Sequence, residues 1–262
     1  MRQAVHDITW RVPRADIQVL NPKRNRYVVI ISVLNEGERL HRQLAKLSKF
    51  LDTCDVVIAD APSTDGSTEP TILKAAGVHA LVSLREPGGQ SSSFRTGFAY
   101  ALKAGYEGMV IMDGNDKDDP SALPTFAEQL DAGLDYVQGS RFHRGGQAIN
   151  TPLRRMLLIR FVHAPLFSAL CGVRLTDTTN GFRAYSRRFL LDDRVTPFRD
   201  TFCFYEMPFY LSWAACRYGF RTAEIPVIRA YPSTGPVPTK ITGLRGHWRM
   251  LKPLLMLLFR RY

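Results

Sequence analysis

Short apolar runs alternate with amphipathic segments through the first half of the chain, and this alternation constrains the fold more than any other feature. The run YVVIISV at 27–33 is continuous and β-branched, which is typical of a strand buried on both faces of a sheet. It leads into EGERLHRQLAKLSKFL at 36–51, whose leucines recur at helical spacing. The same cycle predicts strands at 54–60, 108–113 and 136–140, and helices at 93–105 and 121–133. Strands alternating with helices are joined by right-handed crossovers, so we expect an α/β fold with a Rossmann-like, mostly parallel sheet covered by helices on both faces.

Polar residues stand where the predicted strands end: Asn35, Asp60, Asp113 and Ser140. In open parallel sheets, ligands bind in the crevice at the carboxyl ends of the strands. The run VIMDGNDKDDP at 110–120 holds four aspartates at one such end. Hard oxygen ligands clustered in this way suit Mg²⁺ or Mn²⁺ bound together with substrate phosphates, whereas the simpler alternative is a solvated loop.

The net charge of +11 is unevenly distributed along the 262 residues. Residues 27–140 hold 9 Lys or Arg against 16 Asp or Glu, whereas 141–199 hold 11 against 3, and 240–262 hold 6 basic residues and no acidic ones. This pattern indicates a cation near the carboxylates, and phosphates or an anionic membrane near the arginines. Nucleic acid is the rival partner, but no zinc-finger, helix-turn-helix or RNA-binding motif supports it, so we expect none.

Several classes of protein are disfavoured by the motifs. SVLNEGE follows the first predicted strand in place of GxGxxG, and GxxxxGK[ST] is absent, which argues against a dinucleotide-binding oxidoreductase and a P-loop NTPase. The four cysteines have no metal-ligand spacing and are expected to be reduced thiols. The chain has neither a signal-peptide core nor an apolar run of about 18 residues, so we expect a cytoplasmic protein that meets a membrane only peripherally.

The alternation is lost after Gly145, where two apolar stretches rich in arginine or lysine suggest helices. TPLRRMLLIRFVHAPLFSALCG at 151–172 and GHWRMLKPLLMLLFRRY at 246–262 either pack into the core or lie on a membrane surface. We therefore expect a C-terminal helical region that faces a substrate or the membrane. The predicted organisation is an N-terminal extension with little regular structure at 1–26, one folded domain at 27–235 and a basic amphipathic tail at 236–262.

Six segments occur together in an order and spacing that resemble those of family 2 nucleotide-sugar glycosyltransferases. They are VIISVLNEGERL, VIADAPSTDGST, GGQSSSFRTGF, VIMDGNDKDDP, VQGSRFHRGG and TDTTNGFRAYSR. The chain most resembles the branch that makes dolichyl-phosphate or polyprenyl-phosphate mannose or glucose, over about residues 27–240. The resemblance implies the GT-A fold and inverting transfer from a nucleoside diphosphate sugar, linked to UDP or GDP, to a lipid phosphate.

The resemblance also implies roles for particular residues. Nucleotide-binding positions would be Val33, Asn35, Glu36, Asp60, Asp65, Gly89, Arg95 and Asp113. Asp113, with Asn115 and Asp116, would hold Mg²⁺ or Mn²⁺ on the donor pyrophosphate. Arg141 and Arg183 would neutralise phosphate charge during catalysis. Arg229 and Lys240 match the basic pair that holds the acceptor phosphate in this branch.

The chain departs from the family pattern at two positions: Asn115 replaces the usual second aspartate, and Ala61 stands where many relatives have a carboxylate. A lipid phosphate is already an anion and needs no strong base. A saccharide hydroxyl, the alternative acceptor, would need one, and Asp177 or Glu206 would be the candidate. Asn115 raises a second alternative, a non-catalytic nucleotide-sugar binding protein. A nucleotidyltransferase is disfavoured, because it would need a basic, glycine-rich loop directly after the first strand, and SVLNEGE is acidic. The sequence does not decide whether the protein forms a homo-oligomer.

Overall fold

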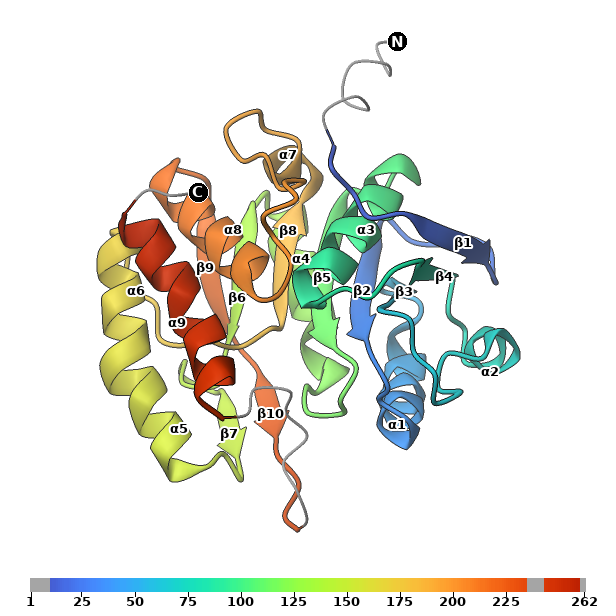
Figure 1. Ribbon diagram of the computed structural model, residues 1–262, viewed down its shortest axis with the longest axis horizontal. Coiled ribbons are helices and arrows are strands. Elements are labelled where there is room, and N and C mark those ends of the chain that lie inside the picture. Colours follow the sequence, from blue (N-terminus) through green and yellow to red (C-terminus); the bar gives the residue numbers. More distant parts are fainter. Residues whose placement is uncertain (1–9, 235–242, 260–262) are drawn as a thin grey trace.

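The computed structural model describes residues 10–234 and 243–259, excluding the side chains of 243–247 and 249–251. An eight-stranded sheet forms its centre (Figure 1), in the order β1-β4-β3-β2-β5-β8-β6-β9. Its strands are β1 Ala15–Val19, β2 Tyr27–Val33, β3 Asp55–Asp60, β4 Ala80–Leu84, β5 Gly108–Asp113, β6 Tyr136–Ser140, β8 Arg183–Ser186 and β9 Thr222–Pro226. Strands β2 to β5 run parallel, as β6 and β9 do, whereas β8 is antiparallel to both of its neighbours. The expected mostly parallel α/β sheet is confirmed.

Helices cover both faces of the sheet. They are α1 Glu38–Leu47, α2 Pro70–Ala75, α3 Gln90–Lys103, α4 Leu123–Asp131, α5 Leu153–Leu158, α6 Ala164–Cys171, α7 Arg187–Leu190, α8 Glu206–Arg217 and α9 Gly243–Leu258. Short 3-10 turns, η1 Ser48–Phe50 and η2 Pro120–Ala122, follow α1 and precede α4, and a π-helical turn, η3 Ile159–His163, joins α5 to α6. A two-stranded sheet pairs β7 Gln147–Ile149 with β10 Ile228–Ala230 in parallel.

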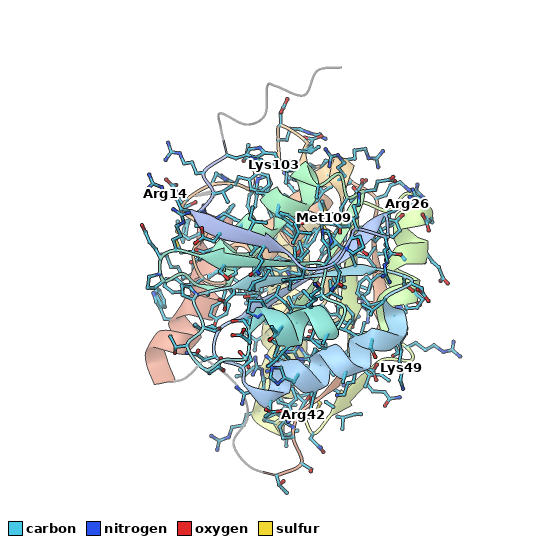
Figure 2. The ribbon with its side chains drawn as sticks, turned by 90° about the vertical axis from the view of Figure 1, so that its right-hand side faces the viewer. Arg14, Arg26, Arg42, Lys49, Lys103 and Met109 are labelled. Carbon is cyan, nitrogen blue, oxygen red and sulfur yellow. The ribbon has the colours of Figure 1, made fainter. Side chains whose placement is uncertain are left out.

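Two apolar clusters, one on each side of the sheet, provide the core. On one side, Phe94 and Phe98 of α3 pack with Ile30 of β2 and with α8. On the other, Leu40 and Leu44 of α1 pack with the opposite face of the same strands. Figure 2 shows Met109 of β5 between Lys103 at the end of α3 and Lys49 beyond α1. Because strands covered on both faces must be apolar throughout, the unbroken runs in the sequence predicted them well.

The N-terminal segment contradicts one expectation. Ala15–Val19 forms β1 and pairs antiparallel with β4 from Ala15↔Leu84 to Val19↔Ala80, so this part of the segment is regular structure. Its apolar residues are few and lie largely exposed, as in an edge strand, and this explains why no periodic signal marked it.

Helices α5, α6 and α9 lie side by side at the left of Figure 1. Helix α9 contacts α6 and α8 and buries Leu254 and Leu257, so part of the expected tail packs on the domain expected at 27–235. No helix in the described ranges is long and apolar enough to cross a membrane.

Candidate functional site

The loops after β2 and β3 clasp each other at the carboxyl edge of the sheet. Asn35, with a positive φ of 50°, donates its backbone N–H to Ser63 Oγ over 3.0 Å, and its Oδ1 accepts the Thr64 N–H over 2.8 Å. Val33 O accepts the N–H of Ala61 over 2.8 Å. Asparagine tolerates the left-handed conformation better than other non-glycine residues, so Asn35 can turn the chain and join both loops.

Two carboxylates order these loops further. Asp60, at the end of β3, accepts the N–H of Ser63 over 3.1 Å. Asp65 accepts the N–H of Gly37 over 2.8 Å and the hydroxyl of Ser67 over 2.6 Å. Burial raises the pKa of Asp65, but these hydrogen bonds outweigh it and leave the pKa below its usual value. Glu36 is paired with Arg39 over 3.1 Å. Five of the expected nucleotide-binding positions therefore share one pair of loops.

The acidic loop after β5 is attached to β10 through backbone and side chains. Asp119 N–H donates to Ile228 O over 3.0 Å, and Ala230 N–H donates to Lys117 O over 2.8 Å. Between these bonds Arg229 enters the loop, and its Nη2 lies 2.7 Å from Asp113 Oδ2 while its Nη1 donates to Asp118 Oδ1. The side chains are 7% exposed for Arg229, 15% for Asp113 and 0% for Asp118, so this is a buried ion triad.

The charges in this triad shift the acidities of its members. Burial raises the pKa of Asp113, but the charges of Arg229 and Lys117 outweigh burial and lower it to about 2. Burial dominates for Asp118 and raises its pKa despite Arg229. The pKa of Arg229 lies well above its usual value, because the two carboxylates outweigh its burial. One arginine shared by two carboxylates therefore keeps Asp113 ionised.

Further cations surround Tyr231, just after β10. Lys117 Nζ lies 5.2 Å from the centre of the Tyr231 ring, and Arg155 Cζ of α5 lies 5.8 Å from it. Burial, reinforced by the charge of Arg229, lowers the pKa of Lys117 to about 7. Sequence analysis did not propose Lys117, Arg155 or Tyr231 for the site. The lysine inside VIMDGNDKDDP was the available signal, since a basic residue among four aspartates invites an ion pair.

Glycines bring two more segments to Asp113. Gln90, at the start of α3, donates Nε2 to Asp113 Oδ1 over 2.9 Å. A Cβ at the preceding Gly89 would stand 2.5 Å from Cys203 O, so only glycine lets the start of α3 pack this closely against the segment before α8. A Cβ at Gly181 would stand 3.3 Å from Asp113 Oδ1, which places the TTNGF loop against the same carboxylate. Gly89 is thus near the site through its backbone.

Arg141 and Asp177 form a second buried ion pair. Arg141 Nε and Nη2 lie 2.6 and 2.9 Å from the two carboxylate oxygens of Asp177, and Nη2 also donates to Thr179 Oγ1 over 3.0 Å. The Asp177 side chain is 0% exposed. Burial raises the pKa of Asp177, but Arg141 outweighs it and leaves the pKa below its usual value. Asp177 therefore orients Arg141, and its expected role as a catalytic base stays a prediction for a carboxylate that is already paired with an arginine.

Two arginines, Arg183 expected at phosphates and Arg95 expected at the nucleotide, donate their hydrogen bonds to groups of the protein itself. Arg183 is buried and donates to the carbonyl oxygens of Asn180, Pro208 and Thr178 and to Ser212 Oγ, over 2.6 to 2.9 Å. Arg95, in α3, donates to Arg11 O over 2.6 Å and Arg199 O over 2.8 Å. Both guanidinium groups tie backbone segments together. Their predicted roles in catalysis and nucleotide binding stay predictions. The sequence did not indicate these contacts, because a motif gives a position and not the direction of its side chain.

Glu206, the other candidate base, accepts the N–H of Phe204 over 2.6 Å and of Cys203 over 3.1 Å. Its carboxylate caps the turn before α8. Both candidate bases are therefore already paired with groups of the protein, Asp177 with Arg141 and Glu206 with backbone N–H groups. Lys240, expected to hold the acceptor phosphate beside Arg229, lies outside the described residues.

The expected metal ligands divide into those that fit a cation and one that does not. Asp116, with φ 62°, turns away to pair with Lys46 over 2.7 Å and Arg42 over 3.1 Å on α1. Asn115 Nδ2 donates to Asp113 Oδ2 over 3.4 Å. Among the described residues, Asn115 Oδ1 and Asp118 Oδ2 are buried acceptors without hydrogen-bond partners. No group of three or more carboxylate, histidine or cysteine side chains converges within the described ranges. Asp113, Asn115 and Asp118 thus fit a cation that takes its remaining ligands from substrate phosphates and water, as Mg²⁺ does.

Comparison with known proteins agrees with this architecture. The model of the family described as glycosyl transferase family 2 matches residues 28–194. Polyprenol monophosphomannose synthase of Mycolicibacterium smegmatis is 30% identical over 207 residues, covering 77% of this chain and 76% of that protein. Undecaprenyl-phosphate mannosyltransferase of Micrococcus luteus is 32% identical over 163 residues, covering 61% and 66%.

Solved structures are similar in fold. Glucosyl-3-phosphoglycerate synthase of Mycobacterium tuberculosis, in complex with Mn²⁺, UDP and glucosyl-3-phosphoglycerate, has a TM-score of 0.62 at 18% identity, covering 90% of this chain and 79% of that one. The same enzyme has been solved with Mg²⁺ and UDP. The fold and the strand-end site define a glycosyltransferase with the GT-A fold. The chain belongs to glycosyltransferase family 2.

Proposed function

We propose that this enzyme transfers a hexose from a nucleoside diphosphate sugar to a polyprenyl phosphate. The observation that carries the proposal is the meeting of the nucleotide-side loops with the buried Asp113–Arg229–Asp118 triad at one edge of the sheet. Relatives named for polyprenol and undecaprenyl phosphate support this choice of acceptor. The loops that hold Asp60 and Asp65 would take the base and ribose, and Asp113 would face the diphosphate.

The proposed reaction needs no protein base. An oxygen of the acceptor phosphate attacks the anomeric carbon, the bond from that carbon to the donor diphosphate breaks, and the nucleoside diphosphate leaves with the bonding electrons. Because the attacking oxygen is already anionic, no proton has to be removed, which agrees with the local contacts of Asp177 and Glu206. Attack opposite the leaving group inverts the anomeric configuration.

Charged residues would lower the barrier by stabilising the leaving diphosphate. Asp113, Asn115 and Asp118 would hold Mg²⁺ or Mn²⁺, which supplies positive charge at the phosphates when bound. Arg141, oriented by Asp177, retains Nη1 as the nitrogen not used for Asp177 or Thr179, and we propose that it contacts a phosphate. Arg229 and Lys240 would serve the acceptor phosphate.

The decisive experiment is transfer of radiolabelled sugar from GDP-mannose, GDP-glucose, UDP-glucose and UDP-galactose to undecaprenyl phosphate with MgCl₂ or MnCl₂. Labelled lipid should appear with one donor and should be lost in Asp113→Ala. Transfer to a saccharide acceptor offered in parallel, with none to undecaprenyl phosphate, would favour the saccharide-hydroxyl alternative. Donor binding without turnover on any acceptor would favour the non-catalytic binding protein.

We propose further that the enzyme binds an anionic bilayer through an apolar face on α5, η3, α6 and α9. This face includes the exposed side chains of Leu157, Leu158, Phe161, Leu166, Leu258 and Phe259. Arg154, Arg160 and Lys252 lie exposed on the same helices. Apolar side chains flanked by cations are typical of helices that lie in the headgroup region, and a lipid acceptor would be delivered there. Attachment to the cytoplasmic side of the membrane stays a prediction.

A further inference from the structure

Arg229 stands where a cation between Asp113 and Asp118 would stand. Its two terminal nitrogens engage one oxygen of each carboxylate, Asp113 Oδ2 and Asp118 Oδ1. All three side chains are buried or nearly so. Two ionised carboxylates placed together in a buried site are unstable without a counter-charge, so the arginine stabilises the site when nothing else is bound.

The oxygens that Arg229 leaves unused form a second feature of the same site. Asn115 Oδ1 and Asp118 Oδ2 are buried and have no hydrogen-bond partner in the described part of the chain. Asn115 is held beside Asp113 by its Nδ2. Buried oxygens without donors are destabilising, and hard oxygens of this kind are ligands for Mg²⁺ and Mn²⁺. The site is thus filled by an arginine yet still has acceptors that a guanidinium in this position does not satisfy.

We propose that Arg229 is an internal counter-ion that a divalent cation displaces from Asp113, after which the guanidinium binds a phosphate group of a substrate. A cation at Asp113 repels Arg229 and takes its partner, so the arginine needs another anion. A phosphate offers oxygens to both terminal nitrogens. Metal alone should therefore bind weakly, and metal and phosphate should strengthen each other's binding. The phosphate belongs to the donor diphosphate or to the lipid acceptor, an assignment that rests on the proposed function.

The exchange requires only a side-chain movement. The backbone of β10 is fixed to the acidic loop on both sides of Arg229, through Asp119 N–H to Ile228 O and Ala230 N–H to Lys117 O. Because these bonds do not involve the guanidinium, they can persist while it turns from Asp113 towards a ligand. Metal binding at Asp113 would thereby free Arg229 to bind a phosphate without a rearrangement of the loop.

The test is a Mn²⁺ titration of the purified, nucleotide-free protein, with unbound Mn²⁺ measured by electron paramagnetic resonance. Arg229→Gln should bind Mn²⁺ at least about tenfold more tightly than the wild type, since the competing cation is gone. The melting temperature of Arg229→Gln should be lower than that of the wild type and should recover when Mn²⁺ is added. Mn²⁺ alone should barely change the melting temperature of the wild type. If Arg229→Gln folds poorly, Arg229→Lys should show a smaller gain, since it keeps the charge and loses the two-pronged contact.

Arg155→Gln is the matched control. It removes a half-buried cation from the same cluster without touching either carboxylate, and it should tighten Mn²⁺ binding by less than about threefold. An equal gain in both variants would reduce the effect to general charge and overturn the proposal. Unchanged or weaker Mn²⁺ binding in Arg229→Gln would also overturn it.

A second titration identifies the phosphate. GDP, UDP or farnesyl phosphate is added at saturation, and the gain in Mn²⁺ affinity is measured for the wild type and Arg229→Gln. The compound whose gain falls at least about fivefold in the variant supplies the phosphate that Arg229 binds. Equal gains in both proteins would show that the displaced arginine binds no phosphate. Sugar transfer by the wild type is measured separately. If Mn²⁺ does not displace Arg229, the proposed transfer reaction is unaffected, and if no sugar is transferred, the displacement of Arg229 by Mn²⁺ is still tested by these titrations.

Discussion

His163 lies buried at the end of η3, where its Nδ1 lies 2.6 Å from Thr178 Oγ1. Its ring stacks on Phe167 and lies tilted against Phe209. Burial, reinforced by the charge of Arg183, lowers its pKa from 6.5 to about 4. The unfolded chain therefore binds more protons than the folded protein between these pH values. Because excess protons on the unfolded state weaken folding, this histidine makes the protein less stable as the pH falls from 6.5 to 4.

We expect His163→Gln to reduce this loss of stability. Relative to the variant, the wild type should lose about 3 kcal/mol of unfolding free energy between pH 7 and pH 4, as the pKa difference implies. Urea unfolding at several pH values measures it. His143→Gln, at an exposed histidine, should keep the pH dependence of the wild type. A His163→Gln curve parallel to the wild-type curve would contradict the assignment.

Asp177→Ala should destabilise the protein by about 3 to 5 kcal/mol, because it leaves Arg141 buried without its partner. Asp192→Ala, which breaks the more exposed pair with Arg194, should cost less than about 1 kcal/mol. Urea denaturation compares the two variants. A stable Asp177→Ala protein that has lost transfer activity would instead support the catalytic-base hypothesis.

At the scale of elements, the apolar face of α5, η3, α6 and α9 makes the membrane proposal testable. Phe161→Glu combined with Leu158→Glu should reduce binding to vesicles of phosphatidylglycerol and phosphatidylcholine at least about tenfold, because both exposed side chains leave the bilayer. Vesicle flotation measures the bound fraction. Ile72→Glu, at a 43% exposed residue on α2, should bind as the wild type does. Equal binding by the double variant would reject this face as the contact.

The strand β1 is an edge element, and its removal tests whether the N-terminal segment belongs to the domain. Deleting residues 1–20 should lower the melting temperature and promote association, because the deletion uncovers the edge of β4. Thermal unfolding and size-exclusion chromatography check both effects. Unchanged melting and a monodisperse peak would return the segment to the status of a dispensable extension.

For the molecule as a whole, sequence predicted the parts whose signal is local. Helix α1 followed from leucine spacing, and β2, β3 and β5 followed from unbroken apolar runs ending in polar residues. The loops of Asn35, Asp60 and Asp65 were grouped correctly because carboxyl ends of parallel strands share an edge. The contacts of Arg229, Lys117, Arg155 and Tyr231 could not be predicted, since they join three distant segments.

The contacts of Arg95, Arg183 and Asp116, which the sequence did not indicate, have one physical cause. Each lies in a segment that does reach the site, but its side chain bonds to backbone or to α1 instead. In each case the charged side chain pairs with nearby carbonyl oxygens or opposite charges, because leaving buried polar groups without a partner lowers the stability of the fold. Direction is therefore a property of the packed structure.

The antiparallel strand β8 has a consequence for the order in which the site is assembled during folding. Because β8 runs against β5 and β6, the loop before it arrives at the edge where those strands end and places Gly181 against Asp113. Arg229, which lies 116 positions after Asp113, reaches that edge only with β10. Contacts so distant in sequence form slowly during folding. A chain of which only the first half has been made contains the loops of Asn35, Asp60 and Asp65 but not Arg229, so we expect no sugar transfer until β10 has docked beside the acidic loop.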